Sequence, residues 1–263
     1  MSSPSEIPGT NKPRRLACAE LRGGNDLAEY EAELPGLTGW VSCRPLPPAL
    51  RGGDLYYLSA CSHGVIARVA LADVSGHGEV VSSAAIGLHD SLLQYIDHWD
   101  QSQLIRQLSD SFLSDEFYAT AFVASYYSDA GELLFTNAGH LPPLWYRSAT
   151  REWSFLRDST ALSREVVDLP LGLIPGTKYC QTAVQIAPGD LLLLYTDGIN
   201  ESWNESGSQL GLNGLLGIAR SLPLDSAAGA GKALMEAVAR FRGTASVTDD
   251  ETVVALHRPA EAI

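Results

Sequence analysis

The sequence predicts an α+β domain in which antiparallel β-sheets carry helices on their outer faces. Short apolar runs typical of strands recur along the chain, and several are separated by Gly, Asp or Ser turns, as in antiparallel hairpins. Two longer helical patterns lie between these runs. Strands therefore precede, separate and follow a helical pair, which differs from the strict alternation of a doubly wound parallel sheet.

The expected strands are runs rich in apolar residues. They cover residues 39–44, 55–60, 65–72, 119–127, 133–137 and 191–195. The clearest hairpin signal is the turn sequence Ser-Asp-Ala-Gly at 128–131, which lies between two such runs. These strands alone are enough to build antiparallel sheets.

Helices are expected where apolar residues recur at an interval close to 3.6. They cover residues 79–96, 103–113, 211–219 and 226–241. Asp100 is the expected N-cap of the second, and Asp225 or Ser226 that of the last, because their side chains can accept backbone N–H bonds.

The chain has 263 residues, which suits one large domain or two small ones. No internal repeat or strong linker divides it, so we expect a single domain over 16–263. Residues 1–15 are rich in Ser, Pro and charge and are expected to be a disordered tail. They lack the apolar stretch of a secretory signal, and no run is long enough to span a membrane. The cytoplasm is the expected location.

The formal net charge of −13 argues against nucleic acid and anionic membrane surfaces as partners, because both repel an acidic protein. A cation is the more natural guest. The four cysteines (Cys18, Cys43, Cys61 and Cys180) have neither CxxC nor zinc-finger spacing and are expected to be reduced and mostly buried in strands.

Four aspartates lie at the ends of strand-like runs, next to glycine or another acidic residue. They are Asp54, Asp73, Asp197 and Asp249. Carboxylates brought together repel one another, and a hard divalent cation relieves that repulsion, so oxygen ligands of this kind select Mg²⁺ or Mn²⁺. A single Asp-Gly after a strand is most often only a turn. Spacing alone does not establish that the four converge.

A set of motifs in a fixed order resembles the PPM-type metal-dependent protein phosphatases, in particular the bacterial branch that regulates sporulation and stress sigma factors. The motifs are Gly-Gly-Asp at 52–54, Asp-Val-Ser-Gly-His-Gly at 73–78, Ala-Thr-Ala-Phe-Val-Ala at 119–124, Asn-Ala-Gly-His at 137–140, Pro-Leu-Gly at 170–172, Thr-Asp-Gly at 196–198 and Asp-Asp-Glu-Thr at 249–252. The resemblance covers about residues 40–257.

The resemblance implies an αββα four-layer sandwich, with two antiparallel sheets face to face, helices outside and a metal cluster at one end. It implies that Asp73 bridges two Mg²⁺ or Mn²⁺ ions. Asp197 and Asp249 would complete the shell of one ion, and Asp54 with the backbone carbonyl of Val74 would serve the other.

The implied activity is hydrolysis of phosphoserine or phosphothreonine on a regulatory protein of the anti-sigma-factor-antagonist type. Asp73, Asp197 and Asp249 would act through a metal-bound water, and no covalent phosphoenzyme is needed. The stretch before the fold is too short for a sensor domain, so a separate partner, the tail or expression alone would regulate the enzyme.

Further residues in or beside the matching motifs have two interpretations each. Asp250 is a candidate third-metal or second-shell ligand. Arg51 could clamp the substrate phosphate or be an exposed loop arginine. His77 and His140 could donate a proton to the leaving oxygen, or brace loops by hydrogen bonds. Asn137 is expected to brace a turn.

Two other functions stay open at this point. A pseudophosphatase that grips a phosphoprotein without turnover predicts a missing ligand, and every expected ligand is present. A phosphohydrolase of small molecules would need a deep closed pocket, which the sequence does not reveal.

Overall fold

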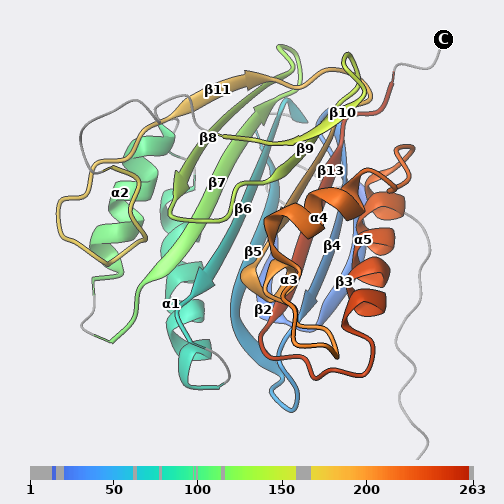
Figure 1. Cartoon of the computed structure of the whole chain (residues 1–263). Coiled ribbons are helices and arrows are strands. Elements are labelled where there is room, and N and C mark those ends of the chain that lie inside the picture. Colours follow the sequence, from blue (N-terminus) through green and yellow to red (C-terminus); the bar gives the residue numbers. More distant parts are fainter. Residues whose placement is uncertain are drawn as a thin grey trace, which may run out of the picture.

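The computed structural model describes residues 14–15, 21–61, 64–76, 79–96, 98, 100–113, 116–157 and 167–260. Within these ranges two β-sheets lie face to face, and helices cover both outer sides (Figure 1). The predicted α+β class and the four-layer order of helices, sheet, sheet and helices are confirmed.

Sheet A contains the strands that begin and end the fold. Its order is β1 (Arg14–Arg15), β3 (Ala28–Leu34), β4 (Leu37–Arg44), β13 (Glu251–His257), β12 (Leu191–Tyr195), β9 (Leu144–Arg147) and β10 (Glu152–Phe155). All neighbours are antiparallel except β1, which pairs in parallel with β3. The last strand in the chain, β13, therefore lies in the middle of the sheet.

Sheet B contains two hairpins, β5–β6 and β7–β8, at its centre. Its order is β11 (Thr182–Gln185), β8 (Glu132–Ala138), β7 (Ala119–Tyr127), β6 (Ile66–Val74), β5 (Arg51–Cys61) and β2 (Leu21–Asp26). Every pair is antiparallel. The predicted hairpin at 128–131 joins β7 to β8, and Gly131 adopts a φ of 65° that favours glycine.

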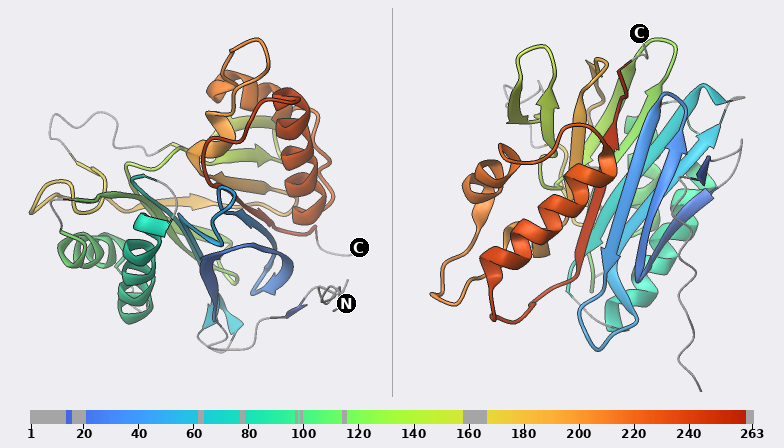
Figure 2. Two further views of the ribbon diagram at one scale, coloured as in Figure 1. Left: turned by 90° about the horizontal axis from the view of Figure 1, so that it is seen from below. Right: turned by 90° about the vertical axis from the view of Figure 1, so that its right-hand side faces the viewer.

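The helices divide between the two outer faces (Figure 2). On sheet B lie α1 (Glu79–Tyr95) and α2 (Gln101–Ser111), and on sheet A lie α3 (Asp197–Asn200), α4 (Gly211–Ala219) and α5 (Ala227–Arg242). None of the described helices is both long and apolar enough to cross a membrane.

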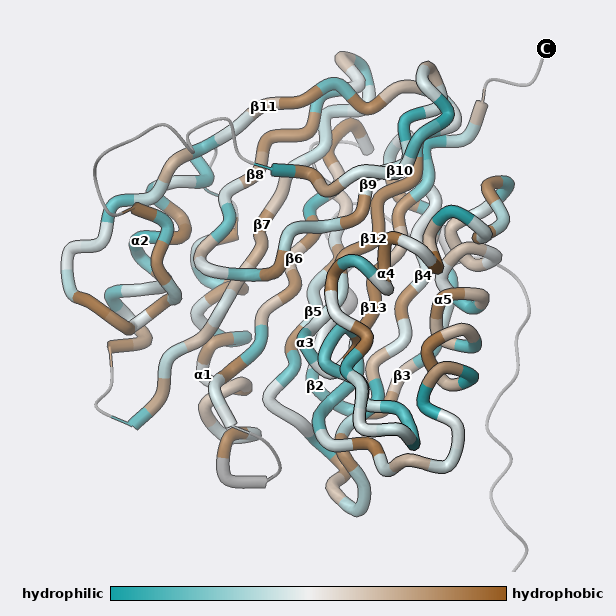
Figure 3. The backbone as a smooth tube through the Cα atoms, viewed as in Figure 1, coloured by the Kyte–Doolittle hydropathy of each residue, from teal (hydrophilic) through white to brown (hydrophobic). Residues whose placement is uncertain are grey.

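Three apolar clusters hold these layers together, and the apolar strands appear brown in Figure 3. One fills the space between the sheets, where Val41 and Leu194 of sheet A meet Leu71 and Phe122 of sheet B. The second joins sheet B to α1 and α2, and the third joins sheet A to α4 and α5. Because side chains alternate along a strand, each sheet buries both of its faces.

The helix ends follow the predicted chemistry with one shift. Helix α2 begins two residues earlier than predicted, because an oxygen of Asp100 accepts the N–H groups of Ser102 and Gln103. Ser226 rather than Asp225 caps α5, and its hydroxyl accepts the N–H of Gly229. Helix α4 has the predicted bounds.

Some strands were missed by the sequence prediction. They are β2, β3, β9, β10 and β11, whereas β13 contains the apolar run that follows Asp249. Strands β2 and β3 contain Gly, Asp and Glu and are partly exposed, while β9, β10 and β11 have only four residues each, so their apolar signal is weak. Within the expected tail, Arg14–Arg15 pairs with Ala32–Glu33, and the other tail residues lie outside the described ranges.

Candidate metal centre

Asp54 and Asp73 face each other across the β5–β6 ladder. They are directly paired in register, and Thr120 of β7 is the partner of Asp73 on its other side. Because paired residues point to the same face of a sheet, all three lie on the face that also presents Leu71 and Phe122 to sheet A. The two aspartates therefore continue the core between the sheets to one end of the sandwich.

Asp197 and Asp249 reach the same end from sheet A. Strands β12 and β13 are antiparallel, with Tyr195 opposite Val253, so the residues after β12 lie beside those before β13. Asp197 is the first residue of α3, where a turn was the simplest expectation. A Cβ atom on Gly198 would lie 2.0 Å from the backbone oxygen of Asp250, so only glycine fits this close approach.

Asp250 is committed to the backbone of the loop that leads into β5. Its Oδ1 accepts the N–H of Leu46 at 2.6 Å, and its Oδ2 accepts the N–H of Gly53 at 2.7 Å. The side chain is 2% exposed. A Cβ atom on Gly52 would lie 2.3 Å from Oδ2. The carboxylate thus ties the start of β13 to the segment that carries Asp54, which is a structural role for this candidate ligand.

The carboxylates at this end disfavour one another's charged form. Burial, followed by the charges of Asp54, Asp197, Asp249 and Asp250, raises the pKa of Asp73 to about 10. Burial and then chiefly Asp249 raise the pKa of Asp197 to about 6. Burial raises the pKa of Asp54 well above its ordinary value, with Asp250 and Asp197 adding to the effect. The five aspartates therefore form one electrostatic cluster.

Thr196, the residue directly after β12, opposes this effect at Asp54. The hydroxyl of Thr196 donates to Asp54 Oδ2 at 2.7 Å, and this hydrogen bond lowers the pKa of that carboxyl. Thr196 Oγ1 also accepts the N–H of Thr252 at 3.0 Å. Burial, and then the charge of Asp54, raises the pKa of the free thiol of Cys43 to about 12, so the thiol stays neutral beside the cluster.

A divalent cation fits this cluster in charge and in donor chemistry. The donors are carboxylate oxygens, their charges repel, and the carbonyl oxygen of Val74 lies 2.8 Å from the position of a Cβ on Gly53, next to Asp54. In the described ranges, however, no group of three or more acidic, histidine or cysteine side chains is already arranged to hold an ion. The bonds from Thr196 to Asp54 and from two backbone amides to Asp250 hold these carboxylates in other contacts.

Three other residues named from the sequence, Arg51, His77 and Ser75, belong to the segments next to Asp54 and Asp73. Arg51 is exposed at the start of β5 and lies 3.8 Å from Asp26 in an ion pair, so its phosphate-clamp role stays a prediction. His77 lies outside the described residues. Ser75 accepts the N–H of Tyr118 at 3.2 Å, as a loop hydroxyl would.

His140 braces its loop and is neutral at physiological pH. The backbone N–H of His140 donates to Asn137 Oδ1 at 2.7 Å, and Asn137 Nδ2 donates to the backbone carbonyl of His140 at 3.0 Å. These two bonds confirm the bracing role of Asn137. His140 Nδ1 bonds the Thr120 hydroxyl at 2.7 Å. Burial lowers the pKa of His140 to about 4, so it carries no imidazolium proton to donate at pH 7.

Sequence reasoning missed the hydrogen bonds of the polar residues that surround the aspartates. Thr196, Thr252 and Thr120 lie within or beside motifs that were recognised, but their spacing gives no hint of their partners. The ion pair between Arg242 and Glu251 is similarly invisible, because its members come from α5 and β13.

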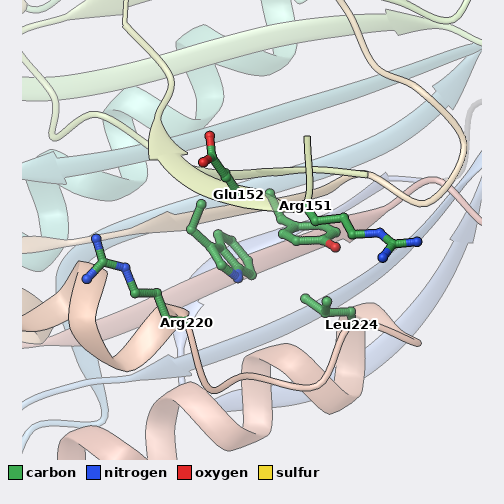
Figure 4. A pocket seen from close by; sticks show the side chains of 6 residues that line it. Arg151, Glu152, Arg220 and Leu224 are labelled. Atoms are coloured by element: carbon green, nitrogen blue, oxygen red, sulfur yellow. The ribbon is translucent and has the colours of Figure 1, made fainter. Parts of the chain in front are cut away.

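A hollow of about 650 Å³ lies on the outer side of sheet A, away from this cluster (Figure 4). Tyr146, Trp153 and Leu224 line it together with Arg151, Arg220 and Glu152. Arg151 is in the β9–β10 turn, at the end of the sheet opposite Asp197, because Leu144 pairs with Leu193 and Tyr146 with Leu191. The guanidinium groups of Arg151 and Arg220 point to opposite sides, so they do not converge on one guest.

Solved structures share this architecture. The PP2C phosphatase domain of the cell-fate determinant SpoIIE from Bacillus subtilis superposes with a TM-score of 0.70 at 19% identity, covering 90% of this chain and 66% of the other. The catalytic domain of the serine/threonine phosphatase PstP, solved with two manganese ions, has a TM-score of 0.56 at 17% identity, covering 84% and 97%. The chain therefore has the PP2C fold.

The family follows from the sequence. Residues 66–259 match the family model described as Stage II sporulation protein E (SpoIIE), and the chain belongs to this family. It is also similar to the phosphoserine phosphatase RsbU of Bacillus subtilis (strain 168), at 26% identity over 168 residues. That match covers 62% of this chain and 47% of RsbU, so the chain matches about half the length of this relative.

Proposed function

We propose that this protein is a metal-dependent phosphoprotein phosphatase that hydrolyses phosphoserine or phosphothreonine on a regulatory protein. The observation that carries the proposal is the meeting of Asp54 and Asp73 from one sheet with Asp197 and Asp249 from the other. Their mutual repulsion is what a pair of divalent cations would relieve. Membership of the SpoIIE family and similarity to a phosphoserine phosphatase support the substrate class.

Each residue has a defined part in this proposal. Asp73 would contribute to holding both Mg²⁺ or Mn²⁺ ions, Asp197 and Asp249 would hold one of them, and Asp54 with the Val74 carbonyl would hold the other. When bound, the ions would supply a water of lowered pKa and positive charge for the phosphoryl oxygens. Proton donation by His140 is not part of the proposal, because burial keeps its ring neutral.

The chain's own contacts prepare the site. Asp250 fixes the Gly53 amide, and with it the direction of Asp54, at the start of β5. Thr196 hydrogen-bonds Asp54 across the two sheets and favours its ionised form. We propose an anti-sigma-factor antagonist as the type of substrate and a separate protein as the regulator, in keeping with the sporulation and stress branch of the family.

The test is release of phosphate from a phosphoserine peptide and from p-nitrophenyl phosphate, with Mn²⁺, Mg²⁺ or EDTA. The proposal predicts metal-dependent release from the peptide by wild type, and loss of it in Asp197→Asn. Asp129→Asn is the matched control, because Asp129 is exposed in the β7–β8 turn and should keep full activity.

Other outcomes would support other functions. Phosphate release from p-nitrophenyl phosphate, with no release from either the peptide or an intact phosphoprotein, would favour a phosphohydrolase that acts on small molecules. Folded protein that binds a phosphoprotein but turns over no substrate with either metal would be a pseudophosphatase. Activity that survives in Asp197→Asn would contradict the proposed site.

A further inference from the structure

Arg242, the last residue of α5, contacts both of the segments that carry aspartates in sheet A. Its Nη2 donates to Oε1 of Glu251, the first residue of β13, and to the Ser202 hydroxyl at 3.2 Å. The side chains of Arg242 and Glu251 are 11% and 7% exposed, so this ion pair is shielded from water. An arginine here reaches two partners at once through its planar guanidinium.

Both partners lead directly to proposed ligands. Ser202 Oγ donates to the carbonyl of Gly198 at 2.8 Å, and Gly198 follows Asp197. Glu251 comes two residues after Asp249. One guanidinium therefore connects the turn after β12 to the start of β13, at the point where a Cβ on Gly198 would collide with the backbone of the facing segment.

We propose that Arg242 is a positioning residue for the metal centre: through Glu251 and Ser202 it fixes the separation of Asp197 and Asp249. This role rests on the proposed metal-dependent function. Residues that hydrogen-bond to metal ligands and orient them lower metal affinity or activity by about 10- to 100-fold when they are removed. The pair is a costly device for stability alone, because two ions have to be taken out of water.

The experiment measures Mn²⁺ binding to the full chain by isothermal titration calorimetry, with folding checked by circular dichroism. We expect Arg242→Met to raise the Mn²⁺ dissociation constant roughly 10-fold or more. Arg240→Met is the matched control in the same helical turn, because the Arg240 side chain is 72% exposed and its ion pair with Glu236 at 3.8 Å lies on the surface. Its dissociation constant should stay at the wild-type value.

Ser202→Ala tests the same role more gently. It keeps the Arg242–Glu251 pair but removes the bond to the Gly198 carbonyl, and we expect weaker Mn²⁺ binding in protein that remains folded. Leu234→Ala controls for instability: Leu234 is buried in the same helix, so its truncation should lower the melting temperature and leave the dissociation constant unchanged.

Activity separates positioning from substrate binding. At saturating Mn²⁺, the KM of Ser202→Ala for the phosphopeptide should equal that of wild type, while the Mn²⁺ concentration for half-maximal rate rises. Unchanged Mn²⁺ binding in Ser202→Ala and in folded Arg242→Met overturns this role and leaves the phosphatase intact. Wild type that binds neither Mn²⁺ nor Mg²⁺ overturns the proposed function itself, and the role of Arg242 falls with it.

Discussion

The hydroxyl of Thr196 donates a hydrogen bond of 2.7 Å to the carboxylate of Asp54, which lies in the opposite sheet of the sandwich. Thr196 follows β12, whereas Asp54 lies in β5, so this bond joins the two layers at the acidic end. The same hydroxyl oxygen accepts the N–H of Thr252. A single side chain thus satisfies a buried amide and a buried acid.

Thr196→Val should therefore be destabilising although it preserves the shape of the side chain. The variant leaves the Thr252 amide without its acceptor and removes a donor from Asp54, and each buried loss costs about 1–3 kcal/mol. Urea denaturation in EDTA measures the change in unfolding free energy. Thr196→Ser retains the hydroxyl and should stay close to wild type. Equal unfolding free energies of wild type, Thr196→Val and Thr196→Ser would show that these hydrogen bonds do not contribute to stability.

Asp249 and Asp250 are adjacent but should respond differently to the same substitution. Asp250→Asn has one carbonyl oxygen for the two amides of Leu46 and Gly53, so it should lower the unfolding free energy by about 1–3 kcal/mol even in EDTA. Asp249→Asn should abolish metal-dependent activity with a much smaller effect on metal-free stability.

Paired measurements of melting temperature in EDTA and of Mn²⁺ affinity distinguish the two. The interpretation of Asp250 as a structural anchor is wrong if Asp250→Asn melts like wild type without metal and only its Mn²⁺ affinity falls. Asp190, a buried acid that accepts backbone N–H bonds at the far end of β12, offers a third comparison, because Asp190→Asn should destabilise without changing Mn²⁺ affinity.

Gly198→Ala should disrupt the acidic end by steric conflict. A methyl group there would lie 2.0 Å from the Asp250 carbonyl, and neither backbone segment can retreat without separating β12 from β13. We expect a loss of at least about 2 kcal/mol of unfolding free energy and of metal-dependent activity. Gly217→Ala is the control, since this exposed position in α4 has open space and should gain roughly 0.5–1 kcal/mol from the removal of a helical glycine.

The fold could be predicted from sequence where a segment carries its own signal. The run 191–195 is wholly apolar, and β12 has those bounds. Asp100 and Ser226 have short side chains that reach the first N–H groups of a helix, so those caps are local chemistry. Strands such as β3, which has Glu at alternate positions, acquire their identity only by pairing with β4, and pairing partners are not encoded locally.

The candidate site divides in the same way. Asp54 and Asp73 flank consecutive runs that a hairpin would bring together, so their proximity follows from local pairing. Asp197 and Asp249 come together through the pairing of β12 with β13, but their approach to Asp54 and Asp73 depends on how sheet A stacks on sheet B, and no spacing in the chain expresses that. The structural role of Asp250 depends on its hydrogen bonds to the amides of Leu46 and Gly53, which lie about 200 residues away in sequence.

His140 should make the protein less stable in mild acid. Burial lowers its pKa in the folded state to about 4, below the ordinary value of 6.5, so the unfolded chain binds a proton that the folded chain refuses. Its contribution is intact above pH 6.5 and is lost as the pH falls toward 4. Between pH 7 and pH 5 this amounts to about 2 kcal/mol.

The contribution can be isolated by comparing wild type with His140→Asn in EDTA at both pH values. The acidic cluster responds to pH in both proteins, and its effect cancels in the difference between them. Wild type should lose about 2 kcal/mol more than the variant on going from pH 7 to pH 5. An identical pH response of the two proteins would mean that His140 is protonated in the folded state.

Asp73→Asn should stabilise the metal-free protein while it abolishes activity. Burial and four neighbouring aspartates raise the pKa of Asp73 in the folded protein to about 10. The contribution of Asp73 to stability is therefore complete below its ordinary pKa of 3.8 and is lost as the pH rises from there toward 10. The metal-free wild type should therefore lose up to about 1.4 kcal/mol per pH unit more than the variant between pH 6 and pH 9. Urea denaturation in EDTA measures both slopes.

Adding Mn²⁺ then reverses the order of the two proteins. A cation bound only by the folded wild type stabilises it by mass action, whereas Asp73→Asn has lost the proposed bridging ligand and should gain little. The acidic end is thus predicted to destabilise the metal-free protein and to become stabilising when metal binds. Functional sites often lower the stability of a fold in this way. Equal stability of wild type and variant at pH 9 in EDTA would remove the electrostatic basis of this prediction, because Asp73 would then be ionised without cost among its neighbours.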